Sequence, residues 1–174
     1  MQSQFEIRGL KETLALFQQL ADDIGDKKAT SKVLRPAVMQ AMKPVLSMAK
    51  GLVGVDTGAL KKSLVIVGRR PTKKDKKSQY ITSKDTMIAI VTTKPITRKQ
   101  VKETMGMHKK EIRKYYKDQG SFYDARAVAS EFGTVNRSAK PFMRVSLESQ
   151  AANVASNLGE ILKNKIEKYR SKNL

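Results

Sequence analysis

Apolar residues recur at intervals of three and four along much of the chain, and this spacing predicts amphipathic helices. The first such stretch ends at Gly25, a typical stop for a helix. A second stretch runs from near Ser31 to Gly51 and Gly54, and Pro44 inside it predicts a kink because it removes a backbone hydrogen bond. The apolar positions of the first and last helical stretches are Leu10, Leu14, Phe17, Leu20 and Ile24, and Leu147, Ala151, Val154, Leu158, Ile161, Leu162 and Tyr169.

Runs of β-branched and apolar residues of strand length follow at 64–67 and 87–93, and they predict two strands. Alternation of apolar and polar residues around Phe5 and Ile7 predicts a further short strand ahead of the first helix. Between the two longer runs, the Lys-rich segment 69–78 has little to bury, so we expect a mobile hairpin loop there.

Three more segments complete the expected arrangement. Helical spacing over 101–115 predicts a third helix with a basic outer face. The sequence of 122–132 fits either a strand or a helix. We expect the end of the chain, 170–174, to fray. Together these elements predict one α+β domain over residues 1–174. In it an antiparallel sheet packs against three to four helices, including a long second helix and a C-terminal helix.

The composition adds one strong asymmetry of charge. Hydrophobic residues make up 40% of the chain, enough for a core, yet no uncharged apolar run approaches the roughly 20 residues of a membrane span, so we expect no membrane partner. The net charge is +19, and residues 61–120 supply most of it, with 18 basic and 5 acidic side chains. Such an excess is typical of a surface that binds a polyanion, although a solvated Lys-rich surface or an acidic protein partner fits it too. The basic positions that we single out as contacts to DNA or to an acidic partner are Arg69, Arg70, Lys73, Lys74, Lys76, Lys77, Lys109, Lys110, Arg113 and Lys114.

The chain offers few catalytic candidates. Asp56-Thr57-Gly58 is similar to the active-site turn of retroviral-type aspartic proteases, whose chemistry needs two carboxylates that share one proton. That turn joins β-strands, whereas a helical pattern precedes Asp56, so we favour a structural role in which Asp56 caps a short helical turn ending at Leu60. His108 is the single His and there is no Cys, which supports neither a metal site nor a nucleophile with an oriented base. We therefore expect no enzymatic activity, no metal and no cofactor.

Two short blocks combine a turn-forming Gly or Pro with anchoring apolar residues, a pattern that fixes backbone geometry. They consist of Asp56, Thr57, Gly58, Ala59 and Leu60, and of Glu131, Phe132, Gly133 and Thr134 with the downstream Pro141, Phe142 and Arg144. In these blocks and in the order of its elements, the chain resembles the neck and tail-completion proteins of long-tailed bacteriophages, the minor tail or head–tail joining family. The resemblance covers residues 4–68 and 123–160.

The resemblance implies a non-enzymatic virion protein that assembles in the host cytoplasm. It would form a homo-oligomeric ring, a hexamer or dodecamer, where neck and tail meet, and would contact other neck or tail proteins. Genomic DNA in the channel of the ring, or an acidic neighbouring ring, could meet the basic loop at 69–85, and 94–120 would be a helical insertion. The alternative is a stand-alone basic nucleic-acid-binding protein, followed by an aspartic protease acting through Asp56.

Overall fold

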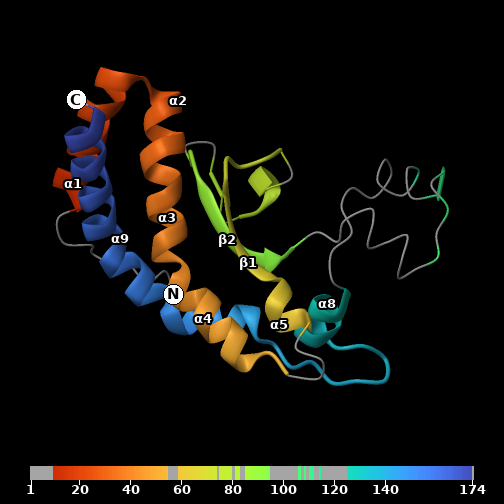
Figure 1. Ribbon diagram of the computed structural model, residues 1–174. Helices are drawn as coiled ribbons and strands as arrows, with labels where there is room; N and C mark the ends of the chain where they lie inside the picture. Colours follow the sequence, from red (N-terminus) through yellow and green to blue (C-terminus); the bar gives the residue numbers. More distant parts are fainter. Residues whose placement is uncertain are drawn as a thin grey trace.

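The computed structural model describes residues 10–54, 59–73, 75–79, 81–82, 85–94, 106, 108, 110–111, 114 and 125–173. Within these ranges it confirms the α+β fold: a two-stranded antiparallel sheet lies beside a layer of helices (Figure 1). The principal helices are α1 (Leu10–Ile24), α3 (Arg35–Ala41), α4 (Lys43–Leu52) and α9 (Met143–Asn173), and the strands are β1 (Leu64–Arg69) and β2 (Ile88–Thr93).

Helix α1 ends where the sequence predicts, because Gly25 adopts a φ of 85° and donates its N–H to the carbonyl of Ala21 at 2.7 Å. The side of α1 that packs against the other helices carries Thr13 and Leu20, which are buried. Leu14 is about half exposed, so its assignment to the buried stripe is wrong. Leu20 is buried, and Phe17 and Ile24 pack against the same core cluster, so the predicted stripe is confirmed at these positions and fails at Leu14.

The second helical stretch begins at Asp26, ahead of the expected start near Ser31, because Gly25 makes the corner and Asp26 suits the positive end of a helix dipole. The helical path is interrupted at Met42, with φ −78° and ψ −3°, two positions before Pro44. The predicted kink is therefore confirmed. The pieces before the kink are α2 (Asp26–Ala29), the π-helical segment η1 (Thr30–Leu34) and α3.

The two predicted strands form a hairpin that is attached to the helical layer. Leu64 pairs with Thr93 at its buried end, directly after the short helix α5 (Ala59–Ser63). Strand β1 lies so close to α3 that a Cβ added to Gly68 would stand 2.8 Å from Cγ of Met39. This close approach places one end of the hairpin beside the second helical stretch.

The Lys-rich segment between the strands contains a defined turn, where the sequence indicated only a mobile loop. Residues Asp75–Lys77 form the 3₁₀ turn η2. Asp75 pairs with Arg69 and accepts a hydrogen bond from the backbone N–H of Thr72 at 2.7 Å. One carboxylate thus gives the described part of the segment a local structure despite its small apolar content.

The structure decides two predictions about the C-terminal part of the chain. The open segment 122–132 contains a helix, α8 (Ala125–Phe132). Helix α9 continues to Asn173, so the predicted fraying of its end is wrong for the described residues, and Arg170 Nη2 lies 3.9 Å from Asp23 Oδ2 of α1.

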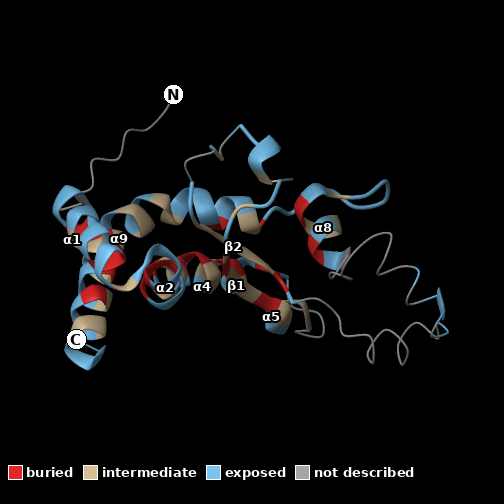
Figure 2. Cartoon of the chain, turned by 90° about the horizontal axis from the view of Figure 1, so that it is seen from above, coloured by how far each residue is buried: buried red, intermediate tan, exposed pale blue. Residues whose placement is uncertain are grey.

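Helix α9 connects two hydrophobic clusters, and Figure 2 shows buried positions on both parts of the molecule. Its buried residues include Ser146 and Gly159, whereas Leu147 is exposed. Leu147 is therefore wrongly placed on the predicted stripe. The first cluster is formed by Leu20, Val33, Ala37, Leu162 and Ile166, and the second by Ala49, Val53, Leu64, Ala127 and Phe142.

Several expectations fall outside the described ranges. They are the strand around Phe5 and Ile7, the turn of Asp56, Thr57 and Gly58, and most of the expected helix over 101–115. In the ranges that are described, no helix combines the length and the apolar character needed to cross a bilayer.

Candidate functional site

The second sequence block forms a joint between α8 and α9 that centres on a buried carboxylate. Glu131, in the last turn of α8, is 4% exposed. Its Oε2 accepts hydrogen bonds from the backbone N–H groups of Phe142 and Met143, both at 2.9 Å, and its Oε1 accepts one from Arg144 N–H at 3.1 Å. N–H groups at a helix start have no partner within the helix. A side chain of α8 therefore caps α9.

Arg144 completes the joint from the α9 side. Its Nε donates to Glu131 Oε1 at 3.0 Å and its Nη2 donates to the backbone carbonyl of Glu131 at 3.2 Å. The guanidinium also lies over the ring of Phe132, 5.2 Å from the ring centroid. Arg144 thus holds both the side chain and the backbone at the end of α8.

The electrostatics of the joint favour ionised Glu131. Burial of the carboxylate opposes ionisation, but the hydrogen bonds from the backbone of Met143, Phe142 and Arg144 and from the Arg144 side chain outweigh it, and they hold the pKa of Glu131 below its ordinary value. A buried charge satisfied by four donors orders its surroundings. We conclude that this carboxylate has a structural role.

A tight turn at Gly133 follows α8 and completes the joint. Gly133, the turn-forming glycine of the block, has a φ of 78°, and its N–H donates to the carbonyl of Ala129 at 2.9 Å. A Cβ at Gly133 would lie 2.9 Å from both Arg137 O and Ala139 N, which are backbone atoms. Thr134 and Arg137 pair across the turn through hydrogen bonds of 2.8 and 3.2 Å.

The joint brings the described part of the first sequence block close to the second. Leu60 packs against the cluster that contains the buried Phe142 of the second block. Pro141 is exposed directly before Phe142, and Thr134 is exposed in the turn. Segments more than 70 positions apart in sequence therefore share one small core, although Asp56, Thr57 and Gly58 themselves lie outside the described residues.

Apolar side chains project from this joint into solvent. Val128 and Phe132 are 58% and 68% exposed, and they are four residues apart on α8, so they lie on the same side of the helix. Val135, in the turn, is fully exposed. Exposed apolar groups that lie next to one another on a fixed support are typical of interaction surfaces.

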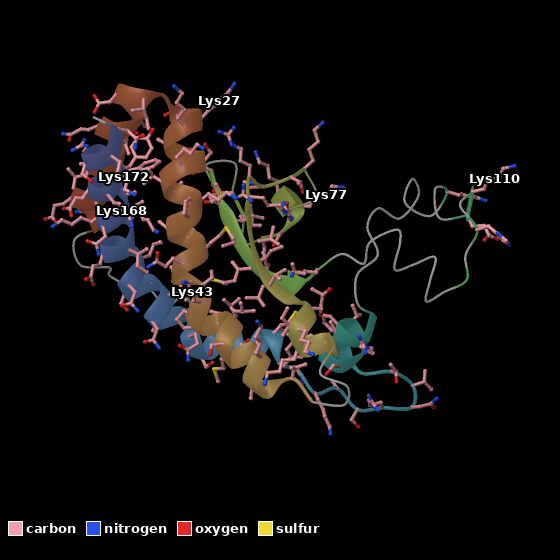
Figure 3. The ribbon with its side chains drawn as sticks, viewed as in Figure 1. Lys27, Lys43, Lys77, Lys110, Lys168 and Lys172 are labelled. Atoms are coloured by element: carbon pink, nitrogen blue, oxygen red, sulfur yellow. The ribbon has the colours of Figure 1, made fainter. Side chains whose placement is uncertain are left out.

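The basic positions singled out from the sequence separate in the structure. Arg69 is engaged by Asp75, and the hydrogen bonds from Arg69 and from Thr72 hold the pKa of Asp75 well below its ordinary value. The described residues Arg70, Lys73, Lys76, Lys77, Lys110 and Lys114 are exposed. Figure 3 shows Lys110 far from Lys77, so these positions do not form one continuous patch in the described part. Lys74, Lys109 and Arg113 lie outside the described residues.

Part of this positive charge borders a pocket that the sequence did not indicate. The pocket has a volume of about 280 Å³ and is lined by Lys27, Thr30, Ser31, Arg35, Gly68, Arg69, Arg70 and Met87. Four of these residues come from α2, η1 and α3, more than thirty positions before Gly68, the first lining residue of the hairpin. No local pattern links the two segments, because only the packing of β1 against α3 brings them together.

In the described ranges, no group of three or more His, Cys, Asp or Glu side chains could hold a metal ion. His108, the single His, donates its backbone N–H to Glu111 Oε2 at 2.7 Å, which is a local contact along the chain.

Comparison with known proteins yields no relationship. No family model matches the chain, and neither a curated protein nor a solved structure shows significant similarity to it.

Proposed function

We propose that the chain is a structural virion protein of a tailed bacteriophage, a tail-completion or head–tail joining subunit that assembles with copies of itself into a ring. The observation that carries this proposal is the joint between α8 and α9. There a buried, fully satisfied carboxylate fixes Phe132 and Val128 in an exposed apolar pair. The resemblance of this block to phage neck proteins gives the proposal its biological setting, with assembly in the host cytoplasm.

The geometry of a ring explains why such a joint would be useful. Each subunit in a closed ring presents one surface and its complement on different faces, so the angle between neighbours must be fixed for the ring to close. Glu131 and Arg144 hold α8 against the start of α9, and Gly133 sets the turn between them. Aromatic side chains and Arg are enriched in protein interfaces, which fits Phe132 and Arg144. We commit to a second copy of this chain as the occupant of the surface.

The test is a mass measurement on the purified chain by light scattering and by negative-stain microscopy. We expect a defined oligomer, six or twelve subunits in a ring, at micromolar concentration. The double variant Val128→Ser, Phe132→Ser should shift the population to monomers without lowering the melting temperature by more than a few degrees. A monomer at every concentration, also in the presence of purified neck and tail rings, would contradict the proposal.

The matched control is Leu14→Ser. Leu14 is exposed to a similar extent, but it is the one exposed large apolar side chain among the residues of α1 whose burial is described, and isolated exposed apolar residues are ordinary. We expect this variant to keep the wild-type mass. A second substitution, Val135→Ser, tests the turn without touching the cation–π contact of Phe132.

The second candidate function is that of a stand-alone basic nucleic-acid-binding protein. The observation that favours it is the net charge of +19, together with the exposed lysines of the hairpin loop. Such a protein would stay monomeric without nucleic acid, so the same mass measurement separates the two functions.

A further inference from the structure

The pocket between the second helical stretch and the hairpin has an unusual set of lining groups. Lys27, Arg35, Arg69 and Arg70 are cationic, Thr30 and Ser31 carry hydroxyls, and none of the described lining residues carries a carboxylate. Figure 3 shows Lys27, one of the lining residues, at the helical side of the pocket and Lys77 on the hairpin loop. A concentration of like charge has a cost unless an anion offsets it.

Most of this charge has no internal partner. Arg69 is paired with Asp75, but the side chains of Lys27, Arg35 and Arg70 make no hydrogen bond or ion pair with any residue that the structure describes. Guanidinium and ammonium groups beside hydroxyl groups are the donors that proteins use to hold phosphate oxygens. The pocket therefore has the chemistry of an anion site.

The absence of a side chain at Gly68 shapes this site. A Cβ at that position would lie 3.3 Å from Cγ of Arg35, so glycine leaves room for the Arg35 side chain beside the strand. Arg35 belongs to α3 and Arg70 follows β1 directly. The close packing of strand on helix thus brings cations from distant parts of the sequence to one opening.

The size and lining of the pocket indicate what kind of anion fits. At about 280 Å³ it exceeds a single phosphate group, and none of the described lining residues is aromatic, so none of them offers a ring on which a base could stack. Exposed Lys73, Lys76 and Lys77 continue the positive charge along the hairpin loop. Backbone contacts need only cations and donors, whereas base recognition needs stacking or paired donors and acceptors.

We propose that this pocket binds phosphodiester groups of nucleic acid, without reading the base sequence. The proposal does not depend on ring formation, because a single subunit carries the whole pocket. Its bound partner is the sugar–phosphate backbone, with Arg35, Arg70 and Lys27 facing the phosphates and the hydroxyl of Thr30 donating to an oxygen, whereas the Ser31 hydroxyl donates to the carbonyl of Lys28.

The test measures the binding of the purified full-length chain to fluorescently labelled duplex DNA of mixed sequence over a series of salt concentrations. Log affinity decreases with log salt. In the double variant Arg35→Gln, Arg70→Gln the magnitude of this slope should decrease by about 1.8, since each lost phosphate contact contributes roughly 0.9. Affinity at low salt should fall at least about tenfold, and exchanging the DNA sequence should change nothing.

The matched control removes the same charge elsewhere. Lys168 and Lys172 are exposed on α9, away from the pocket (Figure 3), and Lys168→Gln, Lys172→Gln should lower affinity by no more than about threefold, through the general field alone. Equal losses in the two double variants would overturn the proposal. If either arginine variant lowers the melting temperature, Lys27→Gln, whose side chain makes no described contact, replaces it in the same comparison.

A second arm separates nucleic acid from an acidic protein partner. Poly-glutamate of similar charge is titrated against the preformed complex with labelled DNA, and inorganic tripolyphosphate is titrated in parallel. Displacement by tripolyphosphate at lower charge concentration than poly-glutamate supports a phosphate site. Preferential displacement by poly-glutamate would overturn the proposal in favour of an acidic polypeptide.

Discussion

The carboxylate of Glu131 accepts a hydrogen bond from the backbone N–H of Phe142 at 2.9 Å, although 11 positions separate the two residues. An N-cap is ordinarily supplied by the residue that directly precedes the helix. Here the cap comes from another helix, so α9 cannot change its direction relative to α8 without losing hydrogen bonds to a buried charge. The geometry of the joint and the stability of α9 therefore depend on the same carboxylate.

The first prediction concerns that carboxylate. Glu131→Ala should lower the free energy of unfolding by about 2–4 kcal/mol, because buried N–H groups and the Arg144 guanidinium lose their acceptor. Urea unfolding followed by circular dichroism measures the change. The control is Glu148→Ala, an exposed acid one turn further along α9, for which we expect a change within about 0.5 kcal/mol. Equal losses in the two variants would show that the cap contributes nothing.

A second prediction follows from the lowered pKa of Glu131. The unfolded chain titrates this group near its ordinary value of 4.5, and the folded chain titrates it at a lower pH. The cap therefore stabilises the fold fully above that unfolded value, and the stabilisation is lost as the pH falls through the folded pKa. The difference in unfolding free energy between wild type and Glu131→Gln should be constant from pH 7 to about pH 5 and should shrink below about pH 4. A difference that grows on acidification contradicts an ionised cap.

Local patterns in the sequence predicted the elements whose packing they themselves determine. Gly25 as a helix stop, the kink near Pro44 and the two strands all depend on residues close to one another in the chain. The exact face of a helix that packs was harder to predict from the sequence, because Leu14 and Leu147 fit helical spacing as well as the buried residues do. Which of two adjacent faces is buried depends on the neighbouring helices.

For the candidate functional residues too, local features were predictable from the sequence and contacts between distant segments were not. The block around Glu131 and Gly133 was visible as a turn with anchoring residues, but the spacing could not reveal that Glu131 caps a second helix. Lys27 and Arg35 gave no signal at all, because they become part of a pocket only when β1 packs against α3. The pairing of Arg69 with Asp75 was equally hidden within a run of lysines.

The third prediction concerns two reasons why a position needs glycine, a positive φ and a lack of space for a Cβ. Three Gly→Ala variants separate them. Gly133 combines a φ of 78° with backbone atoms 2.9 Å from an added Cβ, so Gly133→Ala should cost the most, about 2–4 kcal/mol. Gly25 has a φ of 85° with open space around it, so Gly25→Ala should cost about 1 kcal/mol from backbone strain alone. Gly51, helical and unobstructed, should gain about 0.5–1 kcal/mol as alanine. Thermal and urea unfolding of the three proteins measure this order, and any other order counts against the assigned turn.

The last prediction uses Asp75 to alter the charge near the pocket without removing any cation. The carboxylate of Asp75 occupies Arg69, and its lowered pKa keeps it ionised throughout the neutral and mildly acidic range. Asp75→Asn removes this charge while leaving an oxygen that can still accept the backbone N–H of Thr72. If Arg69 then turns to phosphate, DNA affinity should rise and the slope of log affinity against log salt should steepen by up to about 0.9. The control is Asp23→Asn on the far helix α1, which changes the net charge equally and should leave the slope unchanged. A lower affinity of Asp75→Asn than of wild type would mean that the ordered turn, rather than the number of available cations, governs binding at the hairpin.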